Sequence, residues 1–88
     1  MEIIIQHEVE AIAKRYLTYK FYIFGSSLTC KTYGDIDILI LYESPKFIKS
    51  IRKDFHNIRS YEAFHLMFLS FTEEKELKFI NKVNAREL

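Results

Sequence analysis

The sequence predicts one domain of the α/β or α+β class, built from a small mixed sheet of three or more strands with helices packed on it. Apolar residues recur at helical spacing in three segments and form short continuous runs in three others. Along the chain these segments follow the order helix, strand, strand, helix, strand, helix, which is typical of a layered fold. With 88 residues, 49% of them hydrophobic, and only two Gly and one Pro, the chain has material for one core and few break points. We therefore expect residues 1–88 to form a single domain.

The first helix is predicted over residues 2–20. Its apolar side chains recur three or four positions apart, which is the stripe of an amphipathic helix. They are Ile5, Val9, Ile12, Ala13, Tyr16 and Leu17. This spacing indicates that the helix packs on the rest of the domain along one side.

The other two helices carry start signals. Ser44 is a favourable N-cap and Pro45 fits a first turn, and apolar residues then continue at helical spacing as far as Ile58. Ser70 and Glu73 have the spacing of a capping box that leads into the last helix. The apolar residues of that helix are Leu77, Ile80 and Val83.

Three apolar runs have the length of strands. The first is Phe21–Phe24, closed by Gly25. The second, Asp35–Tyr42, is rich in Ile and Leu at both odd and even positions, so we expect it to be buried on both faces and to lie centrally in the sheet. The third is Ala63–Phe71, expected beside the second.

Composition excludes several classes of protein. Thirteen Lys and Arg against twelve Asp and Glu give a net charge of +1, which argues against a strongly basic nucleic-acid or membrane binder. No apolar run approaches the roughly 18 residues that a membrane span needs. The lone Cys30 cannot form an internal disulfide, and the first residues lack the pattern of a secretory signal. We expect a soluble protein in the cytoplasm.

Two acids stand at the entrance of the second strand. Because side chains alternate along a strand, Asp35 and Asp37 should lie on one face about 7 Å apart. Like charges at that distance repel, so a cation or several hydrogen-bond donors are needed between them. Carboxylate oxygens on a rigid strand suit Mg²⁺, which completes its shell with water and substrate phosphates. The pair predicts half of a metal-nucleotide site.

The turn after the first strand predicts the other half. Gly25 has no Cβ, so backbone N–H groups there can approach an anion closely. Ser26 and Ser27 add hydroxyl donors and can cap a short helical turn. We expect this turn to bind phosphates and to open into the same cleft as Asp35 and Asp37.

Phe24–Ser26, then eight residues, then Asp35–Asp37 on an apolar strand resembles the signature of the DNA polymerase β-like nucleotidyltransferase superfamily. The similarity is greatest to the minimal, stand-alone members, the MNT-type nucleotidyltransferases. The order of predicted elements agrees over most of the chain, which implies the minimal nucleotidyltransferase fold.

This resemblance implies both roles and partners. Gly25, Ser26 and Ser27 would contact the triphosphate of a nucleotide, ATP in the first instance, and the two aspartates would hold one or two Mg²⁺ ions. By its position in the same loop, Lys31 is a further candidate for the triphosphate. The activity implied is transfer of a nucleoside monophosphate to a hydroxyl. In minimal members the acceptor can be a partner protein, as in antitoxins that modify HEPN-type toxins.

The third strand departs from the family pattern. The family usually takes a third carboxylate from it, but His65 stands where that acid is expected, and Glu62 would face the other side of a regular strand. Imidazole is a poor Mg²⁺ ligand. His65 is a core histidine, a general base for the attacking hydroxyl, or a mark of a site that binds without turnover. It should either share the cleft with Asp37 or turn into the core.

Two other functions remain open from sequence. One is a catalytically degenerate module that keeps the fold and acts through protein contacts. The other is a small nucleic-acid binder that uses the basic second helix, which the near-neutral total charge disfavours. The sequence does not fix the base preference or the acceptor, and it leaves a homo-oligomer open.

Overall fold

The computed structural model describes residues 3–25, 35–59 and 63–88. Its helices are α1 (Ile3–Arg15), α2 (Ile48–His56), α3 (Phe71–Leu77) and α4 (Phe79–Val83), with a 3₁₀ turn, η2 (Pro45–Phe47), before α2. Its strands are β1 (Lys20–Phe24), β2 (Asp35–Tyr42), β3 (Ala63–Ser70) and β4 (Arg86–Glu87). The predicted α/β class is confirmed.

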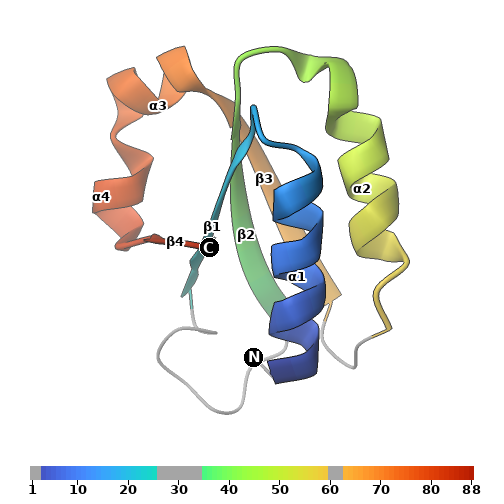
Figure 1. Cartoon of the computed structure of the whole chain (residues 1–88). Coiled ribbons are helices and arrows are strands. Elements are labelled where there is room, and N and C mark those ends of the chain that lie inside the picture. The colour runs from blue at the N-terminus through green and yellow to red at the C-terminus, as the bar shows by residue number, and fades with distance from the viewer. Residues whose placement is uncertain (1–2, 26–34, 60–62) are drawn as a thin grey trace.

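One mixed sheet of four strands forms the middle of the molecule, in the order β3-β2-β1-β4 (Figure 1). β1 pairs antiparallel with β2 and with β4, whereas β3 pairs parallel with β2. The parallel pair is joined through α2, as a crossover connection requires. The prediction that the second strand is central and has the third strand beside it is confirmed.

The alternation of side chains along β2 gives the sheet two apolar faces. Ile36, Ile38 and Ile40 are fully buried in the cluster under α1 and α2, and Leu39 and Leu41 are buried in a second cluster with α3 and α4. Figure 1 shows α1 and α2 on one side of the sheet and α3 and α4 on the other. The chain is therefore a three-layer arrangement in which β2 is buried on both faces.

The first helix is shorter than predicted. It ends at Arg15, and the hydrogen bonds from Tyr16 N–H to Ala13 O and from Tyr19 N–H to Tyr16 O form a turn that leads into β1. Leu17, which was placed in the helical stripe, is 86% exposed. Ile5, Val9 and Ile12 are buried as expected.

The predicted last helix is divided in two. Its capping box is present, with Ser70 Oγ accepting from Glu73 N–H and Glu73 Oε1 accepting from Ser70 N–H. Lys78 then takes a left-handed conformation with φ of 52°, which ends α3. The Glu74 carboxylate accepts hydrogen bonds from the N–H groups of Phe79 and Ile80, so one side chain caps the start of α4.

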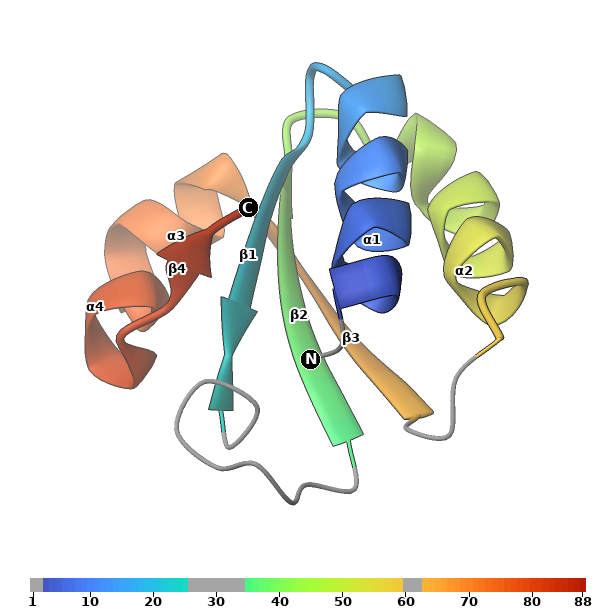
Figure 2. The same ribbon diagram turned by 60° about the horizontal axis from the view of Figure 1, so that its bottom comes forward.

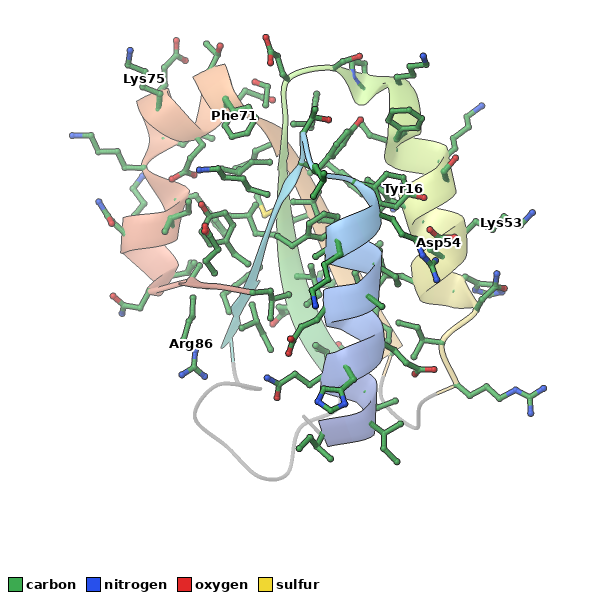
Figure 3. The ribbon with its side chains drawn as sticks, viewed as in Figure 1. Tyr16, Lys53, Asp54, Phe71, Lys75 and Arg86 are labelled. Atoms are coloured by element: carbon green, nitrogen blue, oxygen red, sulfur yellow. The ribbon has the colours of Figure 1, made fainter. Side chains whose placement is uncertain are left out.

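The two helices on the same face are linked by a polar contact. The hydroxyl of Tyr16 donates to Asp54 Oδ2 on α2 at 2.6 Å, and Arg15 Nη1 lies 3.4 Å from the same oxygen. In Figure 3 the labelled Tyr16 and Asp54 face each other between α1 and α2. Burial and then the bond to Asp54 raise the pKa of Tyr16 to about 12.

We expect Tyr16→Phe to lower the free energy of unfolding by about 1 to 2 kcal/mol at pH 8, because a hydrogen bond to a charged acceptor is lost. The pKa of Tyr16 is raised in the folded state, so its contribution is complete below the unfolded value near 10 and fades as pH rises toward about 12. Urea unfolding of both proteins from pH 8 to pH 11.5 measures this. The difference between them should shrink across that range.

Tyr42→Phe is the matched control, since within the described residues the Tyr42 hydroxyl makes no hydrogen bond and its ring stacks on Tyr19. The loss of stability that Tyr42→Phe causes at pH 8 should be small. A constant difference between wild type and Tyr16→Phe from pH 8 to pH 11.5 would contradict the role of the Tyr16–Asp54 bond.

None of the helices formed by the described residues has the length and apolar character that crossing a bilayer requires.

Candidate functional site

The predicted site residues that the structure describes gather at one end of the sheet. Gly25 directly follows β1, Asp35 and Asp37 open β2, and His65 lies near the start of β3. β1 is antiparallel to β2, so the last residues of β1 lie beside the first residues of β2. β3 is parallel to β2, so the first residues of β3 lie on the other side of the same part of β2. Figure 2 shows this end of the sheet turned toward the viewer.

The two aspartates share the face of the sheet that α3 and α4 partly cover. They alternate with Ile36 and Ile38, which are fully buried on the α1 and α2 side. Asp35 is exposed and Asp37 is half-buried. The side chain opposite Asp35 on β3 belongs to Ala63, so the strand pair leaves room beside that carboxylate. The prediction of two carboxylates on one face of one strand is confirmed.

Gly25 packs directly against Asp37. Its φ of +81° lies in the left-handed region, and a Cβ built there would stand only 2.2 Å from Asp37 Oδ2. No other residue type fits without moving the carboxylate. Gly25 and the Asp37 carboxylate are therefore in close contact at this end of the sheet.

His65 contacts the other oxygen of the same carboxylate. Its Nδ1 lies 3.2 Å from Asp37 Oδ1, while its side chain is 79% exposed. This excludes the core-histidine interpretation. When Nδ1 donates its hydrogen to Asp37, the lone pair of the ring lies on Nε2, which is the nitrogen left for a ligand or a proton.

Helices α3 and α4 cover the same face farther along the strands. Their Phe71, Phe79 and Ile80 pack on the cluster around Leu39 and Leu41. Toward the start of β2 the face carries the exposed Asp35 and His65. The described part of the chain thus places Asp35, Asp37 and His65 together on this face, next to the apolar contacts of α3 and α4. We call these three residues the acidic ledge.

Carboxylate oxygens are the kind of ligand that a hard divalent cation such as Mg²⁺ prefers. Asp35 and Asp37 offer carboxylate oxygens on one face, and Gly25 makes room for Oδ2 of Asp37 because it has no Cβ. Over residues 3–25, 35–59 and 63–88, no group of three or more His, Cys, Asp or Glu side chains is arranged to hold a metal ion. The described side chains therefore fit Mg²⁺ only as a two-carboxylate set that water and nucleotide phosphates complete.

Four of the sequence-based candidates lie outside the described residues. They are Ser26, Ser27 and Lys31, predicted to bind phosphate, and Glu62, considered as a third acid. Their roles stay predictions. The contact between His65 and Asp37 was foreseen as one of two outcomes, and the eight-pair parallel register of β2 and β3 produces it by setting Asp37 opposite His65.

Comparison with known proteins does not assign the chain to a family. No protein-family model matches the chain, and no curated protein has a significantly similar sequence.

Proposed function

We propose that the protein is a minimal nucleotidyltransferase that binds a Mg²⁺-nucleoside triphosphate, ATP in the first instance, and transfers its nucleoside monophosphate to a hydroxyl. The observation that carries the proposal is the junction of Gly25, Asp37 and His65, in which one carboxylate on β2 contacts both the glycine after β1 and the imidazole on β3. The mixed sheet with helices on both faces is compatible with the fold of that superfamily.

The roles of the residues follow from their positions. The backbone at Gly25 approaches the phosphates, with Ser26, Ser27 and Lys31 as further phosphate ligands. Asp35 and Asp37 would hold one or two Mg²⁺ ions together with the phosphates of the nucleotide. The cation would supply neutralisation of charge on the phosphates and on the leaving pyrophosphate.

His65 provides the proton acceptor. With Nδ1 held by Asp37, its Nε2 accepts the proton of the acceptor hydroxyl. The hydroxyl oxygen then forms a bond to the α-phosphorus as the bond to pyrophosphate breaks. Asp37 keeps the ring oriented and stabilises the imidazolium that forms, in addition to its carboxylate role toward the cation.

The acceptor that we propose is a partner protein, which would present its hydroxyl beside Asp35, Asp37 and His65. A HEPN-type toxin in a toxin and antitoxin pair, acting in the cytoplasm, is the partner class that the resemblance suggests.

One observation favours a second function. Within the described residues the ledge has two carboxylates, and one of them is hydrogen-bonded to His65 rather than joined by a third acid. A module with this set binds nucleotide or a partner without turnover. The two functions predict different results for nucleotide transfer but the same result for nucleotide binding.

Asp35→Asn tests the shared nucleotide site. Asp35 is exposed and adjoins another acid, so its neutralisation should leave the fold intact while it removes a cation ligand. In calorimetric titration with Mg-ATP, we expect affinity to fall at least about tenfold, equivalent to 1.4 kcal/mol.

Glu76→Gln on α3 is the matched control, because Glu76 is an exposed acid on a helix away from the ledge. It should bind Mg-ATP like wild type. Equal affinities in wild type and Asp35→Asn would remove Asp35 from the site.

A further inference from the structure

The edge of the sheet formed by β3 is long and unpaired within the described residues. β3 pairs with β2 through eight consecutive residues, and the sheet order places no strand on its other side. The opposite edge is formed by β4, which has only two residues. β3 has no Lys, Pro or Gly, the residues that commonly block an exposed edge. Its backbone groups are therefore available to another extended segment.

A groove of about 570 Å³ runs along this edge. Its lining includes the consecutive residues 63–66, which alternate between the two faces, so the groove lies at the strand edge itself. On the α2 side it is bounded by Phe55, Phe64 and Leu66. Phe64 and Leu66 remain half-buried although they belong to the sheet. An added strand would complete their burial.

Arg52 carries the positive charge in the lining of the groove. Its guanidinium lies 4.7 Å from the centre of the Phe68 ring, over the outer strand. The acid of α2, Asp54, is engaged by Tyr16 and Arg15 on the side of α1 and does not neutralise this surface. None of the described residues that line the groove is acidic.

A second copy of the chain fits this edge poorly. A two-fold pairing of β3 with its symmetry mate would continue the sheet and bring two α2 helices side by side on one face. The exposed cations of α2 would then face their own copies, and they are Lys49, Arg52 and Lys53. Like charges at such a junction disfavour the pair. Charge complementarity requires an acidic occupant.

We propose that β3 and α2 form a docking site for an extended acidic segment of a partner protein, which adds to the sheet as a fifth strand. Backbone hydrogen bonds to the edge of β3 provide the pairing. Acidic side chains on one face of the added strand meet Arg52 and His56, and apolar side chains on its other face pack against the half-buried Met67. The groove also borders His65 of the proposed nucleotide site, but docking of the segment needs neither Mg²⁺ nor ATP.

The test uses the full chain and a fluorescent eight-residue peptide of alternating Glu and Val, measured by anisotropy without nucleotide. We expect saturable binding below about 1 mM, which corresponds to a free energy near 4 kcal/mol. Arg52→Glu should weaken binding at least about tenfold. Lys75→Glu, the same charge change at an exposed site on α3 across the sheet, should leave it within about twofold.

Two further peptides separate strand addition from simple charge attraction. A peptide with alternating N-methylated residues keeps the charges but loses backbone donors, and it should not bind. A peptide of alternating Lys and Val should also fail. The proposal is overturned if the Glu peptide does not bind, if the N-methylated or Lys peptide binds equally well, or if an oligonucleotide binds more tightly. A homodimer that Arg52→Glu alters in sedimentation would assign the edge to a second copy instead.

Discussion

His65→Ala is expected to reduce nucleotide transfer by about 10² to 10⁴ fold, the usual contribution of a general base. The imidazole is exposed, and its Nδ1 is held by Asp37, so removal of the ring should not disturb the core. Mg-ATP binding, which rests on the carboxylates and the glycine turn, should change little. The measurement is transfer of label from ATP labelled at the α-phosphate onto proteins co-purified with the chain.

His7→Ala is the matched control, since His7 is an exposed histidine on α1 without a site contact. It should label the acceptor like wild type. Undiminished labelling by His65→Ala would exclude the base role. If wild type binds Mg-ATP but labels no co-purified protein, the binding module replaces the enzyme as the function.

Gly25→Ala should have the largest effect on the site as a whole. The alanine would need a left-handed conformation and would bring Cβ to 2.2 Å from Asp37 Oδ2, so either the turn or the carboxylate must move. We expect a loss of about 2 to 4 kcal/mol in the free energy of unfolding. Mg-ATP affinity should fall with it, because the turn and Asp37 act as one unit.

A double-mutant cycle with Asp37→Ala separates the contact from the backbone strain. Without the carboxylate, the nearest remaining atom of residue 37 would be its Cβ at 3.4 Å, an ordinary contact. Gly25→Ala should therefore destabilise the Asp37→Ala protein less than it destabilises wild type. Equal losses in the free energy of unfolding in the two backgrounds would show that the contact between Gly25 and Asp37 does not contribute to the cost of Gly25→Ala.

The sheet was predictable because its strands are strongly patterned. β2 is apolar at odd and even positions from Ile38 to Leu41, which is sufficient to predict burial on both faces and a central place. Asp35 and Asp37 lie on one face because side chains alternate between the two faces along a strand. The acids and His65 come together once β3 is placed parallel to β2 in register.

The helix ends were less predictable. Leu17 fits the stripe of the first helix by spacing, but the chain turns at Tyr16 to reach β1, and this turn depends on tertiary contacts of Tyr19 with Ser44 and Phe47. Ile58, expected in the second helix, lies beyond the end of α2. Local sequence does not contain these contacts.

The break between α3 and α4 had no sequence signal of the usual kind. Neither Gly nor Pro stands there, and Lys78 adopts a left-handed conformation, which is uncommon for residues other than Gly. Glu74 provides the compensation by capping α4 from one turn earlier. After α4 the chain forms the two-residue β4, which pairs with β1 at Tyr22 and Ile23.

The structure of the protein crystallised with Mg²⁺ and a non-hydrolysable ATP analogue tests the nucleotide site most directly. The account predicts a triphosphate against the backbone at Gly25, with the cation bound by Asp35 and Asp37 and His65 Nε2 facing the α-phosphate. A nucleotide bound elsewhere on the protein, or an empty ledge at millimolar analogue, would contradict it.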